Sequence, residues 1–167
     1  IGFRIQLMSP DIVPESMPDF LVKKVPLYKF GTTNEIGLPG KVLYAPQYDH
    51  PAFLDALQEM DGLLSAAYNG HPQVEFMDTY MYGFWGEGHT WPFANKHPFS
   101  DYTTAENTFI KIFERQCVNW KNTPLLTNTQ PDFSRVGNSE IVDRTIRSHN
   151  WLRTDTIFIE NMQIESL

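Results

Sequence analysis

Three stretches of the chain place apolar residues three or four positions apart, which is the spacing of one face of an α-helix. In the clearest stretch, Pro51 suits a first helical turn after Asp49 or His50 as the cap. Asn69-Gly70 then provides a residue that tolerates positive φ and ends the helix. Between these signals runs one apolar stripe: Phe53, Leu54, Leu57, Met60, Leu64 and Ala67.

Two further helices are expected in the second half of the chain. One begins near Thr103, where Glu106 stands three residues later as in a capping box, and its buried face holds Phe109, Ile110, Phe113 and Val118. The other is capped by Asn138-Ser139 and carries Ile141, Val142, Thr145, Ile146 and His149.

Short apolar runs of the kind that form strands separate these helices, at residues 3–8, 74–79, 124–129 and 155–159. Residues 9–47 are rich in proline and glycine and predict a long excursion, with one short extended piece at 41–44. Strands that alternate with helices predict an α/β fold with a parallel sheet. The first strand is not followed by a glycine-rich phosphate motif, which disfavours a nucleotide-binding doubly wound sheet.

Polar and aromatic residues gather after each predicted strand and before the next helix. A (β/α)8 TIM-type barrel places its chemistry there, on the rim at the carboxyl ends of its strands. Four strands cannot close such a barrel. We therefore expect residues 1–167 to be one partial TIM-barrel domain, roughly the middle half, with about four βα units and 9–47 as a rim excursion. Residues outside this chain would supply the rest of the barrel.

The loop after the second strand carries the strongest candidate chemistry. Glu87 lies among three glycines and four aromatic residues and could move a proton as a general acid/base. Asp78 or Glu160 could be the second carboxylate that glycosidic hydrolysis needs. We expect further sugar contacts from the aromatic faces and polar groups near the strand ends, namely Tyr82, Trp85, His89, Trp91, Asn128 and Gln130.

Alternatives stand beside several of these assignments. Glu87 could cap backbone N–H groups of its own loop, and Asp78 could pair with Arg4 or Arg153, because buried acids are normally paired. Arg153 and Asp155 are expected to begin the last strand, away from the catalytic rim. Glu87, His89 and His97 could hold a divalent metal, but their spacing matches no established zinc motif, so we expect neither a metal nor a cofactor.

Three segments resemble glycoside-hydrolase-like barrels of the DUF4832 type, which are related to clan A β-galactosidase-like barrels. These segments are 48–54 (YDHPAFL), 68–78 (YNGHPQVEFMD) and 82–89 (YGFWGEGH). The resemblance implies a secreted or periplasmic carbohydrate-active barrel whose fourth strand is 74–79, with Glu87 in the position of the acid/base glutamate. The chain departs from the hydrolase pattern at Gly86, where those enzymes usually have asparagine.

Composition narrows the possible partners. The net charge of −7 argues against a nucleic-acid partner, and no apolar run approaches the ~20 residues that span a bilayer. The single cysteine, Cys117, is expected to be a buried inert thiol. Together these patterns predict a carbohydrate ligand. The expected function is glycoside hydrolysis, and the alternative is a non-catalytic glycan-binding barrel that has lost its carboxylate pair.

Overall fold

The computed structural model describes residues 1–9, 17–32, 40, 42–88, 99–128 and 138–153. Its centre is a four-stranded sheet formed by β1 (Gly2–Arg4), β4 (Phe76–Asp78), β5 (Leu125–Asn128) and β6 (Trp151–Arg153). The strands lie side by side in chain order, and every neighbouring pair is parallel. The predicted α/β fold with a parallel sheet is confirmed.

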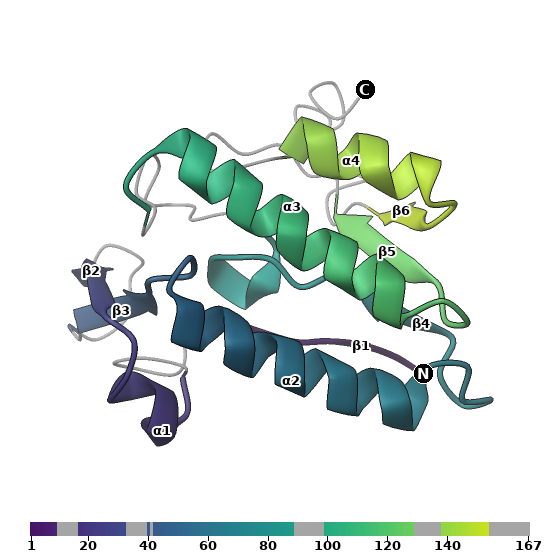
Figure 1. Cartoon of the computed structure of the whole chain (residues 1–167), viewed down its shortest axis with the longest axis horizontal. Helices are drawn as coiled ribbons and strands as arrows, with labels where there is room; N and C mark the ends of the chain where they lie inside the picture. Colours follow the sequence, from purple (N-terminus) through teal and green to yellow (C-terminus); the bar gives the residue numbers. More distant parts are fainter. Residues whose placement is uncertain (10–16, 33–39, 41, 89–98, 129–137, 154–167) are drawn as a thin grey trace.

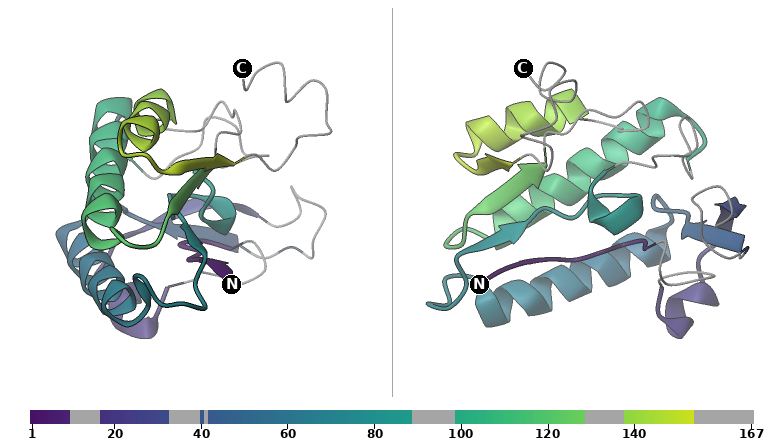
Figure 2. Two further views of the ribbon diagram at one scale, coloured as in Figure 1. Left: turned by 90° about the vertical axis from the view of Figure 1, so that its right-hand side faces the viewer. Right: turned by 180° about the vertical axis from the view of Figure 1, so that it is seen from behind.

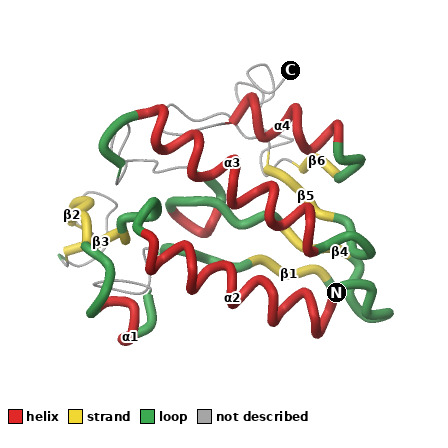
Figure 3. Tube along the Cα trace, viewed as in Figure 1, coloured by secondary structure: helices red, strands yellow, loops and turns green. Residues whose placement is uncertain are grey.

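Each connection between neighbouring strands contains one long helix, as Figure 1 shows. These helices are α2 (Pro51–Tyr68), α3 (Tyr102–Asn119) and α4 (Asn138–Arg147). All three lie on the same face of the sheet (Figures 2 and 3). A doubly wound sheet reverses its strand order and carries helices on both faces, so the described part of this chain is singly wound. Its four strands form an open sheet with β1 and β6 at the edges, and a closed barrel is not seen.

The face of the sheet under the helices forms the core. Met77 and Leu125 are fully buried there, and the Phe3 ring makes edge contacts with Trp120 and Tyr68. Because strand residues alternate between faces, Arg4 and Asp78 beside these apolar residues point to the opposite face. The alternation therefore places Arg4 and Asp78 on the helix-free side, where Phe76 also lies.

The ends of α2 follow the sequence signals. His50 is the N-cap, where its Nδ1 accepts a hydrogen bond of 3.3 Å from the Ala52 N–H, and Pro51 opens the helix. Asn69 is the C-cap, and Gly70 follows with a φ of 79°. The predicted N-cap of α3, Thr103, is wrong. Asp101 caps this helix by accepting a 2.7 Å hydrogen bond from the Thr104 N–H, whereas Thr103 lies inside the first turn.

The Asp101 cap predicts a pH-dependent contribution to stability. Hydrogen bonds from Thr104 and Ser100 lower the pKa of Asp101 below its usual value. A lowered folded-state pKa means that the contribution is present at neutral pH and is lost as the pH falls through that pKa. Urea unfolding should therefore show wild type more stable than Asp101→Ala at neutral pH, with the difference shrinking below about pH 4. A difference that grows on acidification would contradict this role.

The long excursion between β1 and α2 has more structure than the sequence indicated. It contains the short helix α1 (Asp19–Val22) and an antiparallel pair of strands, β2 (Leu27–Thr32) and β3 (Val42–Pro46). The predicted extended piece corresponds to β3. Its partner β2 was missed because Lys29 and Gly31 interrupt the alternation, and a register shift occurs between these same two residues.

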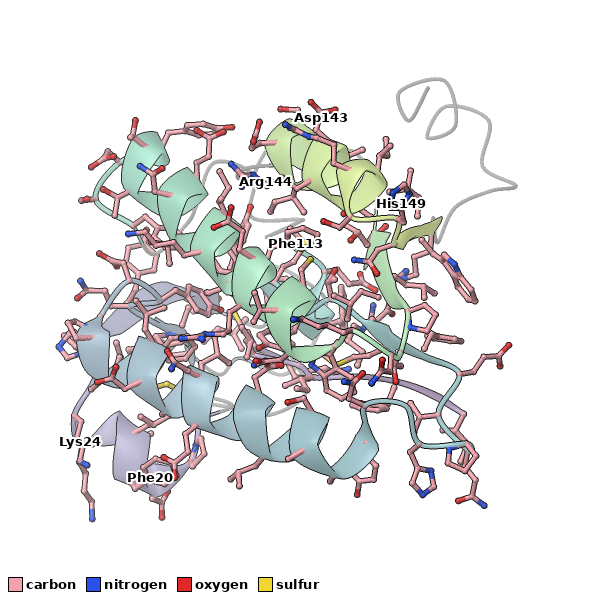
Figure 4. The ribbon with its side chains drawn as sticks, turned by 45° about the vertical axis from the view of Figure 1, so that its right-hand side comes forward. Phe20, Lys24, Phe113, Asp143, Arg144 and His149 are labelled. Atoms are coloured by element: carbon pink, nitrogen blue, oxygen red, sulfur yellow. The ribbon has the colours of Figure 1, made fainter. Side chains whose placement is uncertain are left out.

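Two polar links join the outer helices. Asp61 of α2 is fully buried and accepts hydrogen bonds from Asn119 at 2.5 Å and Trp120 at 2.9 Å, at the end of α3. Arg144 of α4 lies toward α3 in Figure 4 and forms an ion pair with Glu114. The first link is buried and therefore couples α2 to α3 more strongly than a surface ion pair couples α3 to α4.

Candidate functional site

The last residues of all four parallel strands are polar. They are Arg4 of β1, Asp78 of β4, Asn128 of β5 and Arg153 of β6. Arg4 pairs in register with Asp78, and Asn128 pairs with Arg153. Parallel register brings the carboxyl ends of the strands to one edge of the sheet, which is where α/β proteins place ligands. We call this edge the carboxyl edge.

The loop after β4 turns back over the carboxyl edge. Its backbone takes positive φ at Gly83, Trp85, Gly86 and Gly88, and a short 3₁₀ turn, η2, spans Phe84–Gly86. The Trp85 N–H donates to the Met8 carbonyl at 2.9 Å. The Gly83 N–H donates to the buried Tyr48 hydroxyl at 3.2 Å, and burial raises the pKa of that hydroxyl, which keeps it protonated. These contacts hold Glu87 against the strands.

Glu87 and Asp78 form an ion network with two arginines. Arg4 Nη1 lies 2.6 Å from Glu87 Oε1 and 3.6 Å from Asp78 Oδ2. Arg153 Nε lies 2.6 Å from Asp78 Oδ1, and Arg153 Nη2 lies 3.6 Å from Glu87 Oε1. The chain segments that supply these four groups are separated by up to 149 positions in the numbering, yet the parallel register brings them together. We call Arg4, Asp78, Glu87 and Arg153 the edge network.

The edge network is balanced in charge and sheltered from water. Two guanidinium groups face two carboxylates, and the four side chains are between 12% and 24% exposed. At this depth, removing one member leaves its partners poorly compensated.

One nitrogen of Arg4 limits how far apart the two acids can lie. Arg4 Nη1 lies 2.6 Å from Glu87 Oε1 and 3.6 Å from Asp78 Oδ2. These two oxygens therefore cannot be farther apart than the sum of the two distances. That limit admits the ~5–5.5 Å carboxyl separation of retaining glycosidases. Both acids therefore lie beside the same guanidinium group.

Gly86 has a steric reason to be glycine. Its φ is 72°, and a Cβ built there would lie 2.5 Å from the backbone carbonyl oxygen of Ile5. Any larger residue would force a shift of either the loop or residues 5 and 6, which follow β1. The close approach of the loop to residues 5 and 6 therefore favours glycine at this position.

The structure separates the predicted ligand contacts into three groups. Asp78 and Glu87 meet in the edge network, and Asn128 ends β5 beside Arg153 with 3% exposure. Trp85 is half-buried and packs against the core, while Tyr82 is fully buried between Tyr48, Phe99 and Phe109. Tyr82 is thus placed as a core residue that supports the loop. His89, Trp91, Gln130 and Glu160 lie outside the described residues, as does His97.

The sequence predicts the positions of Arg4 and Arg153 less well than those of Asp78 and Glu87. Pairing of Asp78 with Arg4 or Arg153 was considered from sequence, and both contacts are present. The expectation that Arg153 begins the last strand is wrong, because β6 spans Trp151–Arg153 and Arg153 ends it. The signal that could have found this is the strand-like triplet directly after the end of α4. Residues 155–159, where that strand was predicted, are outside the described part.

The described residues give little support to a metal site, a reactive thiol or a membrane-spanning helix. They contain no group of three or more His, Cys, Asp or Glu residues that could hold a metal ion. Cys117 is half-buried, and burial raises the pKa of its thiol, which disfavours the reactive thiolate. Among the helices described, none is both long and apolar enough to cross a membrane.

Comparisons with protein-family models, with curated proteins and with solved structures found no match.

Proposed function

We propose that the carboxyl edge is the sugar site of a carbohydrate-active barrel, and that Glu87 is the proton-transferring group of a glycoside hydrolase. The observation that carries the proposal is the edge network, in which two carboxylates and two guanidinium groups converge at the strand ends. Carboxylates and guanidinium groups offer both acceptors and donors in fixed directions, and sugar hydroxyls need both.

The barrel part of the proposal is supported by the winding of the sheet. Consecutive parallel strands with every helix on one face are the arrangement of part of a (β/α)8 barrel. Closing an eight-stranded barrel requires four strands beyond those described. In such a barrel the edge network would face the mouth, where the loops of other strands would complete the site.

In this proposal Glu87 and Asp78 form the carboxylate pair. Glu87 is in contact with Arg4, and as a carboxylate it can accept a proton from an attacking water. To donate a proton it must first weaken that contact, and a bound sugar that displaces the guanidinium would allow this. Asp78, held by both arginines, is the partner carboxylate within reach.

A second function is favoured by the same contact. If Arg4 stays on Glu87 when the sugar binds, the pair recognises hydroxyl groups without cleaving a bond. The protein would then be a non-catalytic glycan-binding barrel. The two functions share the ligand and the location, and they differ in whether Glu87 gains and releases a proton.

Hydrolysis of a panel of aryl glycosides by the protein in its full-length form separates these functions. If the protein is a hydrolase, Glu87→Gln should lower kcat/KM on a cleaved glycoside at least about 100-fold, the usual contribution of a general acid or base. Glu75→Gln is the matched control, because Glu75 is exposed and lies just before β4, the strand that leads into the Glu87 loop. Turnover by this variant should equal that of wild type.

Two outcomes would contradict the assignment of Glu87. Turnover by Glu87→Gln at the wild-type rate would remove Glu87 from the chemistry. Glycan binding by a wild-type protein that cleaves no glycoside of the panel would favour the binding function. Circular dichroism and thermal melting of each variant would show that a loss of turnover is not a loss of fold.

A further inference from the structure

A cavity lies among the loops that follow β1 and β4, apart from the edge network. Its volume is about 400 Å³, within the range of small-ligand sites. It is lined by β2, the turn between β3 and α2, and the residues before α3, namely Pro26, Leu27, Tyr28, Gln47, Asp49, Phe99 and Ser100. Since both connections leave the carboxyl ends of their strands, the cavity lies on the same side of the sheet as the edge network.

Asp49 lines this cavity and carries a buried carboxylate oxygen that lacks a hydrogen-bond donor. Its Oδ1 atom is buried and has no hydrogen-bond partner. Leaving a buried carboxylate oxygen without a donor costs free energy, and such atoms are uncommon in folded proteins. The N-terminus of α2 begins two residues later and its dipole offsets part of this cost. The carboxylate still lacks a donor at Oδ1.

The rest of the lining suits a cation. Phe99 is held by Tyr48, with ring centroids 5.8 Å apart and an interplanar angle of 28°, and Tyr28 is 40% exposed. Aromatic faces attract ammonium groups. Ser100 donates its hydroxyl hydrogen to Asp101 at 2.8 Å, so its oxygen offers a lone pair. Among the described residues that line the cavity, Asp49 is the one with a charge.

We propose that this cavity binds the primary ammonium group of an organic ligand. The ammonium pairs with the Asp49 carboxylate and neutralises its charge, while the ring of Phe99 or Tyr28 contacts the adjoining carbon. Gln47 and Ser100 supply further acceptors, which matches a group with three donors and no acceptor. A hydroxyl in the same place supplies one donor and leaves the negative charge of Asp49 in the cavity.

Benzylamine and benzyl alcohol test this assignment, because they share a ring and differ in carrying an ammonium or a hydroxyl group. Isothermal titration of the full chain should show saturable benzylamine binding, at least about tenfold tighter than that of benzyl alcohol, since a charged hydrogen-bonded pair is stronger than a neutral one. Asp49→Asn should lose this preference. Asp55→Asn, which changes an exposed acid of α2, should keep it.

Thermal melting gives a second readout that does not depend on the probe. Asp49→Asn removes an uncompensated charge, so its melting temperature should equal or exceed that of wild type, as at other sites where function opposes stability. The proposal is overturned if wild type does not bind benzylamine, binds both compounds equally, or retains its preference in Asp49→Asn. None of these results depends on Glu87, so this proposal and the sugar-site proposal can fail separately.

Discussion

Asp61→Ala is expected to lower the free energy of unfolding by about 3–5 kcal/mol, because it removes the acceptor that three donors share. Asp61 is fully buried on α2 and accepts from Asn119 Nδ2 and Trp120 Nε1. It also receives a hydrogen bond from Tyr80, whose pKa is raised by burial and by this negative neighbour. Alanine would leave three donors without an acceptor, each costing about 1–3 kcal/mol before relaxation.

Chemical denaturation of the folded chain measures this effect. Asp61→Asn should lose less than Asp61→Ala, because the amide oxygen keeps one acceptor in place. Asp55→Ala on the exposed side of the same helix should change the free energy of unfolding by no more than about 0.5 kcal/mol. Similar values for Asp61→Ala and Asp55→Ala would show that the buried cluster does not hold α2 to α3.

Gly86→Ala is expected to cost about 3–5 kcal/mol, from backbone strain and from overpacking together. The residue has a φ of 72°, where a side chain is strained, and its Cβ would lie 2.5 Å from the Ile5 carbonyl oxygen. Ile5 belongs to the chain that leaves β1, so the loop must move away from the strand. Because Glu87 is the next residue, its contact with Arg4 should be lost as well.

Gly62→Ala is the matched control for this substitution. Gly62 lies inside α2 with nothing within 4 Å of a Cβ built there, and alanine should stabilise the helix by about 0.5–1 kcal/mol. Equilibrium unfolding of both variants should therefore give changes of opposite sign. If Gly86→Ala unfolds at the same denaturant concentration as wild type, the close approach between the loop and β1 is not real.

Helix positions could be predicted from sequence where capping and apolar spacing agree. For α2, Pro51 and Gly70 mark both ends and the stripe between them is regular. The start of α3 could not be predicted as well, because two capping signals lie close together and Asp101 is the one whose carboxylate reaches a free N–H. Competition between neighbouring caps is decided by backbone geometry that a linear pattern does not contain.

The edge network shows what sequence can and cannot reveal about a site. Glu87 and Asp78 were identified because an acid in a glycine-rich loop and an acid at a strand end are local features. The roles of Arg4 and Arg153 depend on register between strands far apart in the chain. Predicting the last strand at 155–159 instead of Trp151–Arg153 put Arg153 at its start rather than its end. Tyr82 shows the opposite error, since its aromatic surroundings belong to the core.

The cavity at Asp49 could not be predicted from the sequence at all. Its walls come from three separate segments, one of which is the unpredicted strand β2. Asp49 was noted only as one of two possible caps for α2, and the cap is His50. What distinguishes Asp49 is a buried oxygen without a donor, which is a property of packing.

Binding of the fluorescently labelled full-length protein to an array of glycans tests the central claim that the edge network is a carbohydrate site. Wild type should retain a defined set of glycans, and Asp78→Asn, which keeps the shape of the side chain and removes its charge, should lose at least about tenfold in signal, because a hydrogen bond to a charged group is stronger than one to a neutral group. Glu75→Gln should bind as wild type does. A folded wild type that binds no glycan, or an Asp78→Asn variant that binds as wild type does, would contradict the assignment.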